Sequence, residues 1–150
     1  MGVVVGSLAL RDHAERLSGF SHVMGRDYPH LTVLPALEGR DDNQQTEHLC
    51  RDLLARRPDV VGLYNVGAGN EGIAVALQQA AHRPLFIGHD LTPNTRQYLT
   101  NGLMAALVHQ DPGHQARSAA RVLFALATAE PIHAAQEKIR IEIILRDNLP

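Results

Sequence analysis

Short apolar runs alternate along this chain with longer segments whose apolar residues recur every three or four positions. The short runs have the length of buried strands, and the longer segments have the period of helices that pack on one face. Strands are therefore predicted at residues 3–5, 31–37, 60–64, 84–88, 103–108 and 139–145. Helices are predicted at residues 11–24, 41–57, 72–81, 93–101 and 112–129.

This regular alternation predicts an α/β fold: a three-layer, mainly parallel, doubly wound sheet with right-handed crossovers. The early strands are apolar almost throughout, as expected where helices cover both faces of a sheet. The last one alternates apolar residues with Arg140 and Glu142, which is typical of an edge strand. In such sheets ligands bind beyond the carboxyl ends of the strands.

Composition narrows the class of protein. The chain has 150 residues and a mass of 16.4 kDa, enough for one domain or for one lobe of a larger protein. The net charge of -2 lacks the basic excess of a nucleic-acid-binding surface. No apolar run reaches the length of a membrane span, and no signal peptide is visible, so a cytoplasmic location with no membrane partner is expected. The single cysteine, Cys50, is expected to be a small buried residue.

Polar side chains follow each predicted strand. Carboxylates accept hydrogen bonds, guanidinium groups donate them, and carboxamides do both, so together they suit a hydroxyl-rich ligand. Taken singly, each of these residues is equally well explained as a helix cap or a turn former. The candidates include Arg11 and Arg16 after the first strand, Tyr64 and Asn65 after the third, His89 and Asp90 after the fourth, and His109 and Gln110 after the fifth.

The segment Gly67–Gly72 fits the pattern G-x-G-x-x-G, and the next strand ends at Asp90. This is the context of a dinucleotide fingerprint, so an NAD-binding oxidoreductase is an alternative. Two strand–helix units precede the motif, however, and the polar pair Tyr64-Asn65 stands directly before it. Glycines that let a helix begin close to the sheet are the favoured interpretation. The nine histidines show no metal-binding spacing, so neither a metal nor another cofactor is predicted.

Five segments follow one another in the order RDHAERLSGF, YNVGAGNEGIAVAL, FIGHD, LVHQDP and the final IRIEIILRDNLP. Together they resemble the effector-binding core of the lactose-repressor/galactose-repressor regulators, which has the type I periplasmic-binding-protein fold. RDHAERLSGF resembles the R-x-x-G-F helix of that family, and FIGHD resembles its V-G-[FY]-D strand. The resemblance implies a non-enzymatic sugar or sugar-like effector-binding module of a bacterial transcription regulator. DNA would be contacted only through a domain absent from this chain. The alternative is a solute-binding protein of a sugar ABC transporter.

Carried over residue by residue, the resemblance implies that the ligand is bound by Arg16, Asn65, Asp90 and Gln110, with Arg11 as a further candidate. Tyr64 is the aromatic residue nearest these strand ends, and a sugar ring could stack on it. Val66 stands where the family often has aspartate, which removes one acid from the expected pocket.

The family fold has two lobes with the ligand between them. This chain resembles roughly the C-terminal half, so residues 1–150 are interpreted as the C-terminal lobe, with helix 112–129 belonging to the missing lobe. The apolar face of that helix would then lack its partner. We expect it to pack against a second copy or to fold back, giving a homodimer. The residues of this face are Ala119, Val122, Leu123 and Leu126.

Overall fold

The computed structural model describes residues 1–150, in which six strands form one sheet with the order β2-β1-β3-β4-β5-β6. Neighbouring strands are parallel except for the antiparallel pair β5 and β6. The predicted α/β class, the mainly parallel sheet and the edge position of the last strand are all confirmed. The strands are β1 (Gly2–Val5), β2 (Leu37–Glu38), β3 (Gly62–Asn65), β4 (Leu85–His89), β5 (Ala106–His109) and β6 (Glu142–Ile144).

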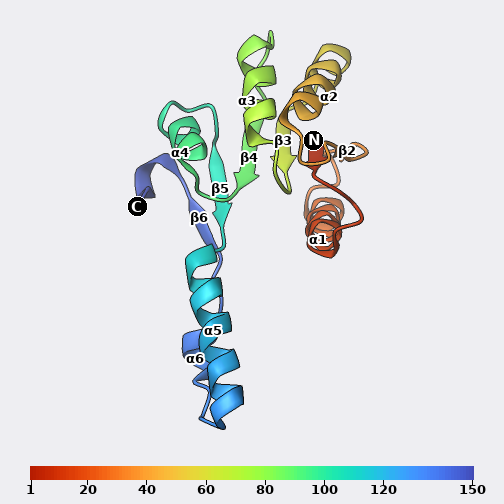
Figure 1. The fold of residues 1–150 in the computed structure, drawn as a ribbon. Coiled ribbons are helices and arrows are strands. Elements are labelled where there is room, and N and C mark those ends of the chain that lie inside the picture. The colour runs from red at the N-terminus through yellow and green to blue at the C-terminus, as the bar shows by residue number, and fades with distance from the viewer.

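Helices cover the sheet unequally. Three of them lie on one face, where their apolar residues meet those of the strands in the main core. Cys50 is fully buried in this core, as predicted. Only the first helix lies on the opposite face, over β1 and β3 (Figure 1). The helices of the main core are α2 (Asn43–Arg56), α3 (Asn70–Gln79) and α4 (Pro93–Thr100), and the helix on the other face is α1 (Arg11–Asp27).

The face that carries α1 is bare over the other half of the sheet. Leu85 on β4 and Ile143 on β6 lie on this face by their register with β3 and β5, and their side chains are 68% and 54% exposed. Parallel sheets are normally covered on both faces. This part of the sheet therefore lacks a layer that a finished α/β fold would have.

Helix α5 (Pro112–Thr128) and the short helix α6 (Ala134–Glu137) extend away from the sheet beyond β5 and β6 (Figure 1). They pack against each other, and few residues of α5 are buried. On its outer side Leu123, Phe124 and Leu126 are 61–68% exposed. Leu123 and Leu126 belong to the apolar face predicted for this helix, and both are accessible to solvent in the isolated chain.

Most element bounds agree with the prediction to within three residues, but those of the second strand do not. The strand predicted at 31–37 is wrong, because only Leu37 and Glu38 join the sheet. Pro35 has no N–H to donate to a neighbouring strand, and the preceding segment lies beside Met1, whose carbonyl accepts from the Leu34 N–H at 2.9 Å. The last strand is shorter than predicted because α6 and its connection occupy the approach to it. No helix is both long enough and apolar enough to span a membrane.

Candidate functional site

A cleft of about 370 Å³ opens at the carboxyl ends of the strands, at the edge of the sheet where a ligand is expected. Its size is within the range of small-molecule sites. Four segments that are distant in sequence converge on it: the start of α1, the loop after β2, the loop between β3 and α3, and the end of β4. The lining residues are Leu10, Asp12, His13, Arg16, Asp41, residues 67–71, His89, Asp90 and Thr92.

Four carboxylates and a single guanidinium group give the cleft its charge. The carboxylates belong to Asp12, Asp41, Glu71 and Asp90. The amide of Asn94 donates a hydrogen bond of 2.9 Å to Glu71 and lowers the pKa of that carboxyl. Carboxylates accept hydrogen bonds from hydroxyl groups and repel other anions. The cleft therefore suits a neutral or cationic polyhydroxyl ligand better than an anionic one.

Arg16 is held in place by the chain's own backbone. Its Nη1 donates to the carbonyl oxygen of Val66 at 2.7 Å, and its Nη2 lies 3.6 Å from Asp12 Oδ2. The first of these contacts joins α1 to the loop after β3. The guanidinium group is thus fixed at the wall of the cleft, and its remaining N–H groups are free to donate to a ligand.

The backbone turns sharply at two of the acidic residues. Asp41 has a φ of 58° and Asp90 a φ of 66°, both in the left-handed region. Among residues other than glycine, aspartate and asparagine enter this region most readily. Backbone conformations of this kind cost energy, and they cluster at binding sites. Their presence at two strand ends supports the assignment of this cleft as the functional site.

His89 forms part of the cleft wall, as predicted, and is only 3% exposed. Its Nε2 lies 2.9 Å from the hydroxyl oxygen of Tyr64, and Nδ1 has no partner. Burial, assisted by the charge of Arg16, lowers the pKa of His89 to about 4, so the ring is neutral at pH 7. Tyr64 does not line the cleft. The centre of its ring lies 4.8 Å from that of the Phe20 ring, between α1 and the sheet, and its hydroxyl group holds the His89 ring in place.

Asn65 shapes the loop that borders the cleft. It is fully buried, and its Nδ2 donates to the carbonyl of Gly67 at 2.9 Å and to Asn70 Oδ1 at 2.8 Å. Asn70 in turn donates to the carbonyl of His89 at 3.1 Å. This chain of amides joins the β3–α3 loop to the end of β4. The side-chain nitrogen of Asn65 is therefore occupied within the protein.

Gln110 and Arg11 lie outside this cleft. Gln110 contacts the side chain of Gln115 on α5, whose Nε2 donates to its carbonyl at 3.0 Å. Arg11 is highly exposed and pairs with Glu15 on the same helix at 2.7 Å. Of the six residues predicted to bind the ligand, the structure thus brings Arg16 and Asp90 together at the cleft.

Sequence reasoning missed several of the lining residues. Asp12 and His13 stand beside the conspicuous arginines of α1, but nothing in the period of that helix distinguishes them. Asp41 stands among other polar residues after the second predicted strand, where the next predicted helix opens, and Glu71 lies within the segment Gly67–Gly72. Their shared feature, proximity to the end of a parallel strand in space, becomes visible only in the fold.

The glycines of the G-x-G-x-x-G segment are explained by packing. A methyl group at Gly67 would lie 2.7 Å from His13 Nε2, and one at Gly72 would overlap the carbonyl oxygen of Asn43 on α2. Gly69 has a φ of 97°, which strongly favours glycine. The glycines therefore make room for His13 and for α2, and they permit a left-handed turn before α3.

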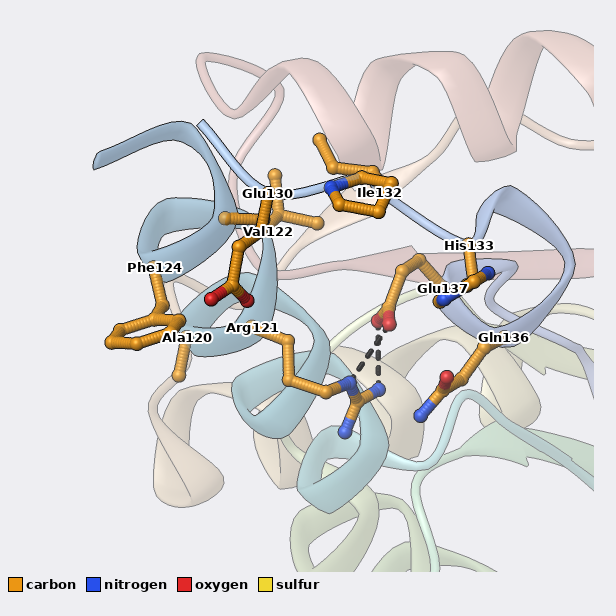
Figure 2. A pocket seen from close by; sticks show the side chains of 11 residues that line it. Ala120, Arg121, Val122, Phe124, Glu130, Ile132, His133, Gln136 and Glu137 are labelled. Carbon is orange, nitrogen blue, oxygen red and sulfur yellow. Dashed lines mark hydrogen bonds and ion pairs between the residues drawn. The ribbon is translucent and has the colours of Figure 1, made fainter. Parts of the chain in front are cut away.

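A second hollow, of about 470 Å³, lies between α5 and α6 (Figure 2). Within it Arg121 donates two hydrogen bonds of 2.8 and 2.7 Å to the carboxylate of Glu137, and this contact lowers the pKa of Glu137 to about 2. Figure 2 shows Arg121 and Glu137 pointing toward one another. No strand end contributes to this hollow, and its one guanidinium group is already bonded to Glu137. We therefore assign the ligand site to the smaller cleft.

Known proteins share the fold of this chain. A family model described as a periplasmic binding protein domain matches residues 1–131. No curated protein sequence matches the chain. Among solved structures, the glucose-galactose binding protein GanP from Geobacillus stearothermophilus is similar, with a TM-score of 0.89 and 23% identity. The match covers 99% of this chain and 54% of GanP.

Two further structures give the same result. An ABC-transporter solute-binding protein from Agrobacterium vitis, bound to α-D-tagatopyranose, matches with a TM-score of 0.85 and 22% identity over 98% of this chain and 50% of its own. A periplasmic solute-binding protein from Actinobacillus succinogenes with bound D-allose matches with a TM-score of 0.82 and 16% identity over 97% and 52% of the two chains. At these identities the likeness shows the fold alone. The chain spans about half the length of each of these structures.

Proposed function

Since the chain belongs to the periplasmic binding protein domain family, which binds its ligands without enzymatic chemistry, we propose that it forms half of a binding site for a neutral sugar or sugar-like molecule. The observation that carries this proposal is the cleft at the strand ends, where Arg16 faces a set of carboxylates. Hydroxyl groups of a sugar would accept from the guanidinium group and donate to the carboxylates. The excess of acid disfavours phosphorylated sugars and sugar acids.

We further propose that the complete protein is a solute-binding component of a sugar transport system. The sugar-binding proteins from Agrobacterium and Actinobacillus described above belong to ABC transporters. About half of each of them shares its fold with almost the whole of the present chain. A role in transport implies action outside the cytoplasm, in place of the cytoplasmic location expected from the sequence.

A second candidate is the effector-binding half of a transcription regulator of the lactose-repressor type. The order of motifs, from the arginine helix through FIGHD to LVHQDP, favours it. Both candidate functions use this cleft, and they differ in the segment that the gene would encode before the two lobes. An encoded DNA-binding head upstream of the two lobes would support the regulator, and an encoded export signal would support the transport protein.

Two exposed apolar surfaces support the proposal that this chain is part of a two-lobed protein. The bare face of β4–β6 and the outer side of α5 are both apolar and exposed. We propose that residues 1–111 and 139–150 form the C-terminal lobe, and that α5 and α6 belong structurally to the other lobe. When the chain is alone, these surfaces would pair two copies, in line with the homodimer expected from the sequence.

The test of sugar binding is calorimetric titration of the full-length gene product with a panel of neutral monosaccharides. Asp90→Asn removes the charge but keeps a residue that tolerates a φ of 66°. Asp90 is exposed in this chain, so its carboxylate is open to a ligand, and the second lobe would enclose that contact in the full-length protein. Losing one charged partner from a buried polar contact costs about 2–5 kcal/mol, so affinity should fall at least about 30-fold.

The matched control is Asp147→Asn, which removes an equally charged but highly exposed carboxylate remote from the cleft. This variant should bind as tightly as the wild type. The proposal is wrong if no sugar of the panel binds the wild-type protein, or if Asp90→Asn binds as well as Asp147→Asn does.

A further inference from the structure

His13 has a position in the cleft that no sequence pattern indicated. It is the third residue of α1, and although its exposed fraction is only 6%, it lines the cleft. Its ring lies between the ends of β1 and β3. A methyl group at Gly6 would be 2.8 Å from its Cε1, and one at Gly67 would be 2.7 Å from its Nε2. Glycine at both strand ends leaves the room that the imidazole occupies.

One hydrogen bond fixes the tautomer of this ring. The backbone N–H of Ser7 donates to His13 Nδ1 at 3.2 Å, so Nδ1 is an acceptor and carries no hydrogen. In a neutral imidazole the hydrogen must then lie on Nε2, which becomes a donor. Nε2 makes no hydrogen bond within the chain, and it is not sealed from solvent. The cleft therefore holds a positioned donor without an acceptor.

Acceptors for a ligand's own hydrogens surround this donor. Asp12 Oδ2 lies 3.9 Å from His13 Nε2, and the carboxylate of Asp41 reaches the same space over Gly6. A sugar hydroxyl at this point could accept from the imidazole and donate to a carboxylate at the same time. That double role suits a hydroxyl group, which is both donor and acceptor.

We propose that His13 is a further ligand-binding residue, whose Nε2–H donates a hydrogen bond to one oxygen of the sugar. The inference rests on the proposed function and deepens it, because it assigns a specificity-determining contact in the same cleft. A neutral hydrogen bond of this kind discriminates against a ligand that lacks the matching oxygen by about two- to tenfold.

The test compares His13→Phe with the wild-type full-length protein by calorimetric titration. The ligands are the neutral monosaccharide that binds the wild type most tightly and its monodeoxy derivatives. Loss of the donor should weaken binding of the parent sugar by about two- to tenfold. One monodeoxy derivative should bind the wild type more weakly than the parent sugar does, and His13→Phe should no longer distinguish the two. His13→Gln, which keeps an N–H near the position of Nε2, should recover most of the loss.

His22→Phe serves as the matched control, because His22 is an exposed residue of the same helix. It should bind all ligands like the wild type. If His13→Phe does not fold, His13→Ala, which adds no bulk, is compared in the same way. Failure of every sugar to bind the wild type overturns the proposed function. Binding that is unchanged by loss of the His13 donor, or weakened equally for every derivative, overturns this inference alone.

Discussion

Helices α2 and α3 lie in close contact at Gly72. A methyl group there would overlap the carbonyl oxygen of Asn43 and lie 2.9 Å from the backbone nitrogen of Glu47, both on α2. Backbone atoms cannot rotate aside, so Gly72→Ala must push the two helices apart. The separation would open the core between them, where Cys50 and Leu77 are buried.

The expected loss of stability follows from two opposing terms. Overpacking a core costs about 1–3 kcal/mol, and the upper end applies because the obstacle is backbone. Alanine recovers up to about 1 kcal/mol through its better helix propensity. The net destabilisation is about 2 kcal/mol, which corresponds to a melting temperature about 4–8 °C lower for a chain of this size.

Thermal and urea unfolding followed by circular dichroism would measure this change. Gly19→Ala is the matched control, because Gly19 lies within α1 and a methyl group there meets no atom within 4 Å. It should raise stability by about 0.5–1 kcal/mol. If Gly72→Ala unfolds at or above the temperature of Gly19→Ala, the close approach of α2 and α3 is not a constraint and the packing argument fails.

Three other changes test the remaining parts of the structure. Thr46→Val removes a buried hydroxyl that has no hydrogen-bond partner, so it should stabilise the chain by about 1 kcal/mol in urea unfolding. Thr95→Val breaks a hydrogen bond of 2.8 Å to the Asp90 carbonyl, so it should destabilise the chain by about 1 kcal/mol. The lowered pKa of His89, about 4 against an ordinary 6.5, means that the unfolded chain binds the proton more readily. Stability should therefore be full above pH 6.5 and decline toward pH 4, and His89→Gln should flatten that decline. In sedimentation velocity the 150-residue chain alone should self-associate. The double variant Leu123→Glu, Phe124→Glu should be monomeric. A monomeric wild type would contradict the pairing of two copies through these exposed surfaces.

The fold was predictable because its signals are local. Thr92 caps α4, and Pro93 occupies its first turn, both as the sequence indicates. Buried strands such as β4 show as short apolar runs. The strand predicted at 31–37 failed because an apolar run next to Pro35 also suits an extended segment that packs without pairing. Helix α6 was missed because a helix of four residues has no period to detect.

The candidate site was predictable only in part. Asp90 directly follows β4, so the rule that ligands bind at strand ends finds it, whereas Arg16 lies on α1 and is indicated by the resemblance of RDHAERLSGF to the R-x-x-G-F helix. Asn65 satisfies the same rule, yet its amide is buried in the β3–α3 loop. Whether a strand-end side chain turns outward or inward depends on the neighbouring loop, which periodicity does not describe. His13 shows the converse, since a residue within a helix enters the cleft only because two glycines make room for it.

The cleft is already organised although other surfaces of the chain are unfinished. Arg16 is fixed by the Val66 carbonyl, Glu71 by Asn94, and His13 by the Ser7 N–H, and none of these contacts needs another lobe. A site that is held in place in advance loses little entropy when the ligand binds. Weak binding by this half alone would therefore come from the contacts that the other lobe supplies. Adding that lobe should raise affinity without changing which hydroxyl groups this half selects.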